Sequence, residues 1–156
     1  MKTASLPQLK KELELCTHKR LIDLTLRIAK HKIENKELLS YLLFESNDDD
    51  YIKEIKDEIC SHFDQMNIRN VYLAKKTLRK TIRTITKYSK YMASKEAECQ
   101  LLLFFCEKLT KSGLPIDSHK SLLSIFTRQK DKINKLIPSL EEDLQYDYSA
   151  LLTELE

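Results

Sequence analysis

The chain has few of the residues that interrupt helices or build tight loops. Its 156 residues include one glycine and three prolines, and tryptophan is absent. Glycine supplies the left-handed backbone conformations of tight turns and phosphate-binding loops. With a single glycine, the chain cannot contain a Walker loop, a G-x-G-x-x-G dinucleotide motif or a G-x-S-x-G nucleophile turn. The scarcity of glycine and proline instead predicts helices joined by short polar connections.

Long apolar runs are also absent. No stretch of about twenty apolar residues occurs, and the start of the chain, MKTASLPQLKKELEL, has no run of the length that a signal peptide requires. Charged residues make up 33% of the chain and hydrophobic residues 42%, which argues against the disordered and membrane classes. We therefore expect a cytoplasmic protein without membrane contact. The four cysteines include no C-x-x-C pair and fit reduced, mostly buried thiols in that compartment.

Apolar residues recur at helical spacing along most of the chain, and residues suited to helix caps separate the repeats. This pattern predicts about seven helices and no strand. The expected helices cover residues 5–16, 17–31, 35–44, 48–66, 70–92, 94–112 and 117–138. A capping box of Ser5 and Gln8 begins the first, and Asp117 or Ser118 begins the last. The final segment, 139–155, is amphipathic and begins with a second capping box, Ser139 with Glu142.

Two of these helices are apolar on nearly every side, namely residues 38–44 (LLSYLLF) and residues 99–106 (CQLLLFFC). Such helices belong at the centre of a domain. The length fits one domain, and no stretch rich in Gly, Ser or Pro marks a linker. We therefore predict an all-α fold, either a compact bundle or a short right-handed helical stack. In this fold residues 1–156 form a single domain around the two apolar helices.

The segment 70–92, NVYLAKKTLRKTIRTITKYSKYM, holds seven Lys and Arg residues and no acidic residue. On a helical projection its apolar residues fall on one side and its cations on the other. The apolar side consists of Ala74, Leu78, Ile82, Ile85, Tyr88 and Met92. The candidate anion-binding residues are Lys75, Lys76, Arg79, Lys80, Arg83, Lys87 and Lys90, with Tyr72 on the same side.

Three interpretations of this cationic side remain open. Residues 65–95 carry nine cations and no anion, whereas residues 139–156 carry six anions and no cation. The cations are solvated, or the acidic segment or the ESNDDD turn neutralises them within the molecule or across a dimer, or they bind an external polyanion. Binding to a phosphate backbone would be salt-sensitive and weakly sequence-selective. In that case Tyr72 would offer a stacking platform for a single-stranded base.

The residue pattern gives no support to a catalytic or metal site. Cys16 and His18, like Cys60 and His62, are two positions apart, which separates them by about 200° on a helix. No paired Glu-x-x-His motif occurs, and the acidic stretch NDDDYIKEIKDE lacks the glycine of a calcium loop. We therefore expect no metal, no cofactor and no catalytic residue, and a protein that is not an enzyme.

The expected function is that of a non-enzymatic binding or scaffold protein, with an unknown protein partner or a second copy of itself. The contact surface would be the apolar stripe of the final segment, provided that part of the stripe is exposed. Its residues are Leu140, Leu144, Tyr148, Leu151 and Leu155. The alternative function is non-specific nucleic-acid binding through the basic helix 70–92.

Overall fold

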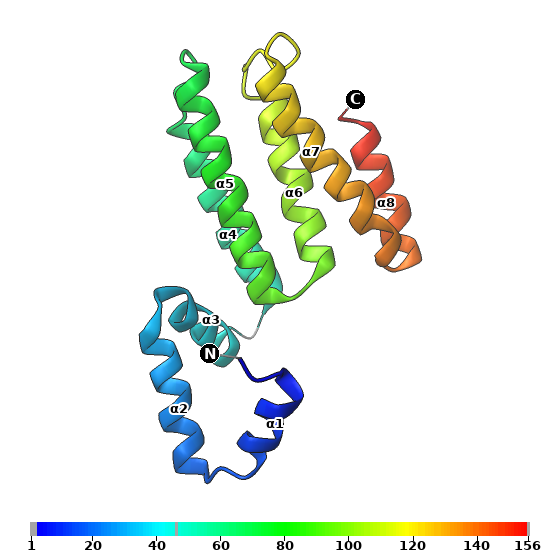
Figure 1. Ribbon diagram of the computed structural model, residues 1–156. Helices are drawn as coiled ribbons and strands as arrows, with labels where there is room; N and C mark the ends of the chain where they lie inside the picture. Colours follow the sequence, from blue (N-terminus) through cyan, green and yellow to red (C-terminus); the bar gives the residue numbers. More distant parts are fainter. Residues whose placement is uncertain (1–2, 46, 156) are drawn as a thin grey trace. The chain divides into compact units, whose positions relative to one another are not determined.

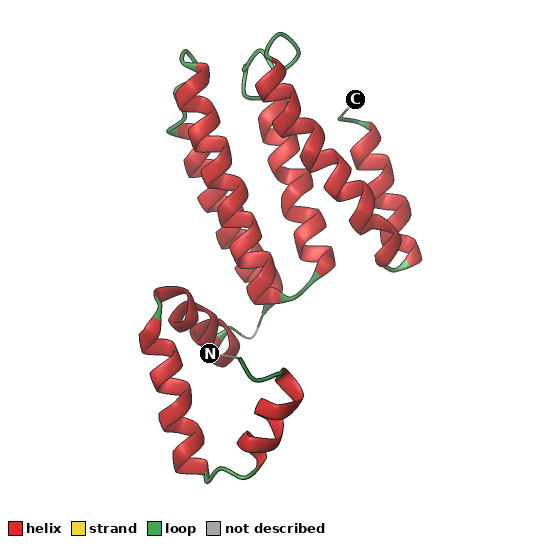
Figure 2. Ribbon diagram, viewed as in Figure 1, coloured by secondary structure: helices red, strands yellow, loops and turns green. Residues whose placement is uncertain are grey.

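The computed structural model describes residues 3–45 and 47–155, which are helical apart from short connections (Figure 2). These residues form eight α-helices and one 3-10 helix and include no strand. The prediction of an all-α helix bundle is therefore confirmed. The helices divide into an N-terminal unit, Met1–Glu45, and a C-terminal unit, Ser46–Glu156. Each unit is described by itself, and the organisation of residues 1–156 as one domain stays a prediction.

The N-terminal unit contains α1 (Leu6–Glu14), α2 (His18–His31) and α3 (Ile33–Phe44) (Figure 1). Helices α2 and α3 pack on each other and are joined by Lys32 alone, whose extended backbone turns the chain. The predicted capping box begins α1, where the Ser5 N–H donates to Gln8 Oε1 over 2.9 Å. No side chain of these three helices is fully buried.

The expectation that residues 38–44 lie at the centre of the fold is wrong. Within the N-terminal unit, α2 is the main neighbour of α3, so only one side of α3 is covered. Leu42, Leu43 and Phe44 remain 64%, 65% and 77% exposed. The apolar composition of a helix indicates that its burial is favourable, but the composition does not specify which surface covers the helix.

The C-terminal unit contains α4 (Asp48–Asp64), α5 (Val71–Met92), α6 (Lys95–Thr110), α7 (Lys120–Leu136), the 3-10 helix η1 (Ile137–Ser139) and α8 (Glu142–Thr153). Helix α6 packs against α4, α5, α7 and α8 and is the centre of this unit (Figure 1). Half of its residues are buried, among them Leu102 and Phe105 with no exposed surface. The predicted central position of residues 99–106 is therefore confirmed.

Two predicted helix starts are wrong, because neighbouring turns use the capping residues. Helix α7 begins at Lys120, after a turn in which the His119 N–H donates to the Ile116 carbonyl oxygen over 3.3 Å. The Ser139 hydroxyl donates to the Leu136 carbonyl oxygen over 2.7 Å and so closes η1. Helix α8 consequently begins after Glu141, without the expected Ser139 capping box.

Candidate functional site

Helix α5 is one uninterrupted helix that is fixed at both ends. Asn70 Oδ1 accepts hydrogen bonds from the N–H groups of Tyr72 and Leu73 over 3.0 and 3.2 Å. Ala93 adopts the left-handed backbone conformation, with φ at 49°, and ends the helix. Ser94 Oγ then accepts from the Ala97 N–H and begins α6. The predicted single helix over residues 70–92 is confirmed.

The buried side of α5 packs on α4 and α6. The buried residues are Ala74, Leu78, Thr81, Ile85, Ser89, Tyr91 and Met92. Ile82 and Tyr88, which the helical projection places on the same side, are half-buried. Complete burial of Leu78 and Ile85 contributes about 1.5–3 kcal/mol each to this packing. Because the buried side fixes the rotation of the helix, the cationic side faces outward.

Five of the seven predicted cations form an open surface, which we call the basic face. Its residues are Lys76, Arg79, Lys80, Arg83 and Lys90, all exposed. The other two predicted cations, Lys75 and Lys87, are half-buried. The Lys87 ammonium lies 4.3 Å from the centroid of the Tyr88 ring. Tyr72 is 73% exposed at the N-terminal end of the same side. Helix α5 therefore brings most of the predicted anion-binding set together.

Within residues 3–45 and 47–155, no carboxylate forms an ion pair with the basic face. Ion pairs elsewhere in these residues join Lys111 to Glu107 and Lys132 to Glu98. The acidic helix α8 packs on α6, α7 and η1. Neutralisation by the acidic segment, one of the three interpretations of the sequence, is thus not found in the described residues. Arg83 Nε donates to the Arg79 carbonyl oxygen over 3.2 Å, and none of the five side chains is held by a carboxylate in the described residues.

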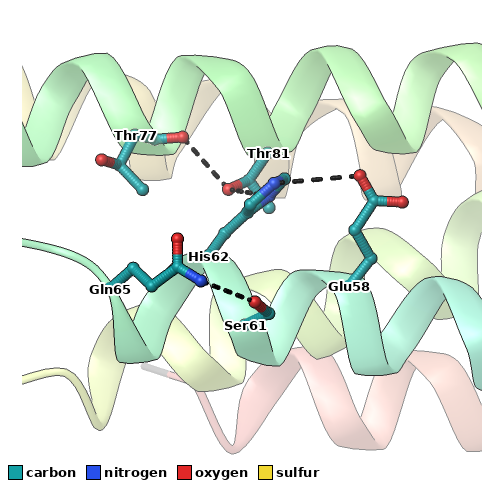
Figure 3. A network of polar contacts seen from close by, with 6 residues as sticks. All are labelled: Glu58, Ser61, His62, Gln65, Thr77 and Thr81. Atoms are coloured by element: carbon teal, nitrogen blue, oxygen red, sulfur yellow. Dashed lines mark hydrogen bonds and ion pairs between the residues drawn. The ribbon is translucent and has the colours of Figure 1, made fainter.

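A polar network lies behind the basic face and joins α4 to α5 (Figure 3). His62 of α4 is only 6% exposed, and its Nδ1 lies 3.2 Å from Thr81 Oγ1. The Thr81 hydroxyl donates to the Thr77 carbonyl oxygen over 3.1 Å. The Thr81 oxygen therefore lies within hydrogen-bond distance of both the Thr77 carbonyl oxygen and His62 Nδ1. On α4, the Gln65 side-chain amide donates to Ser61 Oγ over 3.1 Å.

The protonation of His62 is controlled by three neighbouring influences. Burial lowers the pKa of His62 most, and the positive charge of Lys80 lowers it further. The Glu58 carboxylate, with one oxygen 3.8 Å from His62 Nε2, acts in the opposite direction and raises the pKa. A neutral imidazole is therefore favoured, with Nδ1 bonded to Thr81. Lys80 of the basic face thus influences a buried group on a different helix.

Sequence analysis missed this histidine. The apolar spacing within α4 predicts that burial continues from Ile59 to Phe63, but His62 is buried and Phe63 is half-buried. The signal was present, because position 62 lies three residues after Ile59 and four before Met66, both of which are buried. Hydrophobicity alone favoured Phe63 over its polar neighbour.

The second candidate site is a groove of about 420 Å³ between α6 and α8. Leu103 and Phe104 of α6 form one wall, and Tyr148, Leu151 and Leu155 form the other. Charged side chains of both signs stand at the rim: Lys56, Glu107, Lys111 and Glu154. Lys56 and Lys108 also lie over the Phe104 ring, with each ammonium 5.4 to 5.5 Å from its centroid. We call this feature the α6–α8 groove.

The predicted apolar stripe of α8 is only partly exposed. Leu140, Leu144, Tyr148 and Leu155 are half-buried, and Leu152, between them, is buried. Leu151 is 47% exposed. Burial raises the pKa of Tyr148 to about 12, and the nearby Glu96 carboxylate adds to this shift. Leu152 therefore packs into the core of the C-terminal unit, and Tyr148, Leu151 and Leu155 line the α6–α8 groove. Leu103 and Phe104 were missed as groove residues because their segment is apolar on all sides.

The cysteines form no cross-link in the described residues. Burial raises the pKa of the Cys99 thiol to about 11 and that of the Cys106 thiol to about 12. Both thiols therefore stay protonated, and they lie in the core as predicted. Among the residues that the structure describes, no three His, Cys, Asp or Glu side chains stand close enough to hold a metal ion.

None of the helices in the described ranges has both the length and the apolar character needed to cross a membrane. Comparison of the chain with protein-family models, with curated proteins and with solved structures finds no match.

Proposed function

We propose that the protein is a non-enzymatic binding protein that acts through protein–protein contacts at the α6–α8 groove. The observation that carries the proposal is the partial exposure of apolar walls from two helices around one hollow. Leu151 is 47% exposed and lines the groove together with the half-buried Phe104 of α6, whereas Leu103 is buried. Exposed apolar surface that is rimmed by charged residues is typical of interaction sites. An amphipathic helix of a partner would place its apolar side chains in such a groove.

The N-terminal unit adds support to this proposal. Its three helices leave many large apolar side chains exposed, including Ile22, Ile28, Leu42 and Phe44. A protein that works by contacting other proteins would use such side chains. We further propose a cytoplasmic location, where the four free thiols would remain reduced.

Photo-crosslinking tests the proposed groove. A benzoylphenylalanine at position 151 is expected to form one dominant protein adduct in cells, because that side chain points into the groove. The same group at Ala150, which is exposed but does not line the groove, is the matched control. The adduct is identified by mass spectrometry and the contact is then measured with purified proteins. Equal adducts at both positions, or a Leu151→Glu variant that binds the purified partner unchanged, would contradict the proposal.

A second function is favoured by one specific observation, the free basic face. We propose non-specific binding of nucleic acid through Lys76, Arg79, Lys80, Arg83 and Lys90. Each phosphate contact releases counterions, so affinity for a single strand would fall with salt at a slope of about −0.7 per contact, or about −3.5 for five. The double change Arg79→Glu with Arg83→Glu would weaken binding and flatten this slope. Affinity that is independent of salt would exclude this function.

A further inference from the structure

Tyr72 is aligned with four cations of the basic face along one line of α5. At 100° per residue, Lys76, Arg79, Arg83 and Lys90 all project within about 40° of Tyr72. With a rise of 1.5 Å per residue, the line from Tyr72 to Lys90 is about 27 Å long. All five side chains are exposed, and Tyr72 is the most exposed tyrosine of the helix. We call these five residues the Tyr72 row.

The position of Tyr72 is fixed although its ring is open. Its own N–H is bonded to Asn70 Oδ1, which holds the first turn of α5 in place. The ring therefore projects from an ordered helix start, one turn before Lys76. An exposed aromatic ring at the end of a line of cations combines the two elements that bind single-stranded nucleic acid, a stacking surface and a charged track.

We propose that the Tyr72 row binds single-stranded nucleic acid, with its cations on successive phosphates and one base stacked on Tyr72. This inference rests on the second function proposed above and specifies its ligand. In a duplex the faces of each base are covered by the neighbouring bases, so the Tyr72 ring would make no stacking contact. Polyphosphate and acidic peptides can contact the cations, but they contain no base to stack on Tyr72. The row contains no Asn, Gln or Glu to read base edges, so the binding tolerates many sequences.

Because the chain contains no tryptophan, the fluorescence of a single introduced tryptophan can test stacking directly. The variant Tyr72→Trp places a single indole at the proposed platform, and Tyr146→Trp places one on acidic α8, where the native ring is similarly exposed. A mixed-sequence single strand of about 12 nucleotides should quench the indole at position 72 and leave the one at position 146 unchanged. The matching duplex and inorganic polyphosphate should quench neither. Equal quenching at the two positions, or none with bound single strand, would overturn the inference.

Binding by fluorescence anisotropy separates this inference from the second function. Tyr72→Ala should weaken single-strand binding about tenfold and leave duplex binding unchanged. Arg79→Glu with Arg83→Glu should weaken both. The matched control, Arg128→Glu with Lys135→Glu on exposed positions of α7, changes the net charge equally and should retain binding. If all ligands bind equally and Tyr72→Ala has no effect, the stacked single strand is excluded while polyanion binding survives. If no ligand binds, both fail.

Discussion

The Thr81 hydroxyl oxygen of α5 lies 3.2 Å from Nδ1 of His62 on α4, and both side chains are buried. The same hydroxyl oxygen lies 3.1 Å from the Thr77 carbonyl oxygen. The contact links the helix that carries the basic face to its neighbour through an ionisable group whose pKa is lowered by burial and by Lys80. Stability, protonation and any ligand on the basic face are therefore coupled at this point.

Removing the hydroxyl should destabilise the protein. Thr81→Val keeps the shape of the side chain but leaves the buried Nδ1 of His62 without its hydrogen-bond partner, which costs about 1–3 kcal/mol. The free energy of unfolding in urea measures the loss. Thr127→Val on the exposed surface of α7 is the control and should change stability by no more than about 0.5 kcal/mol. Equal losses in the two variants would show that the contact contributes nothing specific.

The charge of Lys80 should be detectable at His62. Lys80 lowers the pKa of His62, so Lys80→Met should raise this pKa. NMR titration of the imidazole resonances follows the change directly. Lys76→Met removes a different cation of the basic face, and because Lys80 is the cation that lowers the pKa of His62, the titration curve of this variant should match that of the wild type. A pKa that moves equally in both variants would point to the general charge of the face rather than to Lys80.

The stability of the fold should depend on pH through His62. Its pKa in the folded protein lies below the ordinary value of 6.5, so the unfolded chain takes up the proton at a higher pH. The stabilising contribution is therefore complete above about pH 6.5 and is lost as the pH falls through the folded-state pKa. Unfolding of wild type and His62→Gln between about pH 8 and about pH 5 tests this. The difference between them should shrink toward low pH, and a constant difference would contradict the assignment.

The two apolar helices should respond differently to truncation. Leu102 of α6 has no exposed surface, so Leu102→Ala should cost about 2–5 kcal/mol. Leu43 of α3 is 65% exposed, so Leu43→Ala should change stability by no more than about 0.5 kcal/mol. Urea unfolding of the full chain compares the two. A large loss in Leu43→Ala would mean that its side chain is covered in solution.

Local sequence patterns correctly predicted the helices whose apolar spacing and capping residues lie within a single segment of the chain. The single helix over residues 70–92 follows from its apolar spacing, and Asn70 and Ser94 cap α5 and α6. Composition likewise predicted the central position of residues 99–106. In these cases burial depends on a repeat within one segment, so no information about other helices is required.

Features formed between helices could not be predicted in this way. The burial of His62 depends on the position of Thr81, nineteen residues later in the chain. The α6–α8 groove exists because Leu152 is packed while Leu151 is left open, a difference set by the rotation of α8 on α6. Helix α3 has the composition of a core helix but lacks neighbours on most sides within its unit. Each outcome depends on tertiary packing, which a single sequence does not specify.

A nucleic acid on the basic face should change the protonation of His62. Phosphates at Lys80 would offset the positive charge that lowers the pKa of His62, so a saturating single strand should raise that pKa. NMR titration with and without the oligonucleotide measures the shift. In Lys80→Met the charge is already absent, so the ligand-induced rise should be smaller in this variant. An unchanged pKa at saturation would place the bound phosphates away from Lys80.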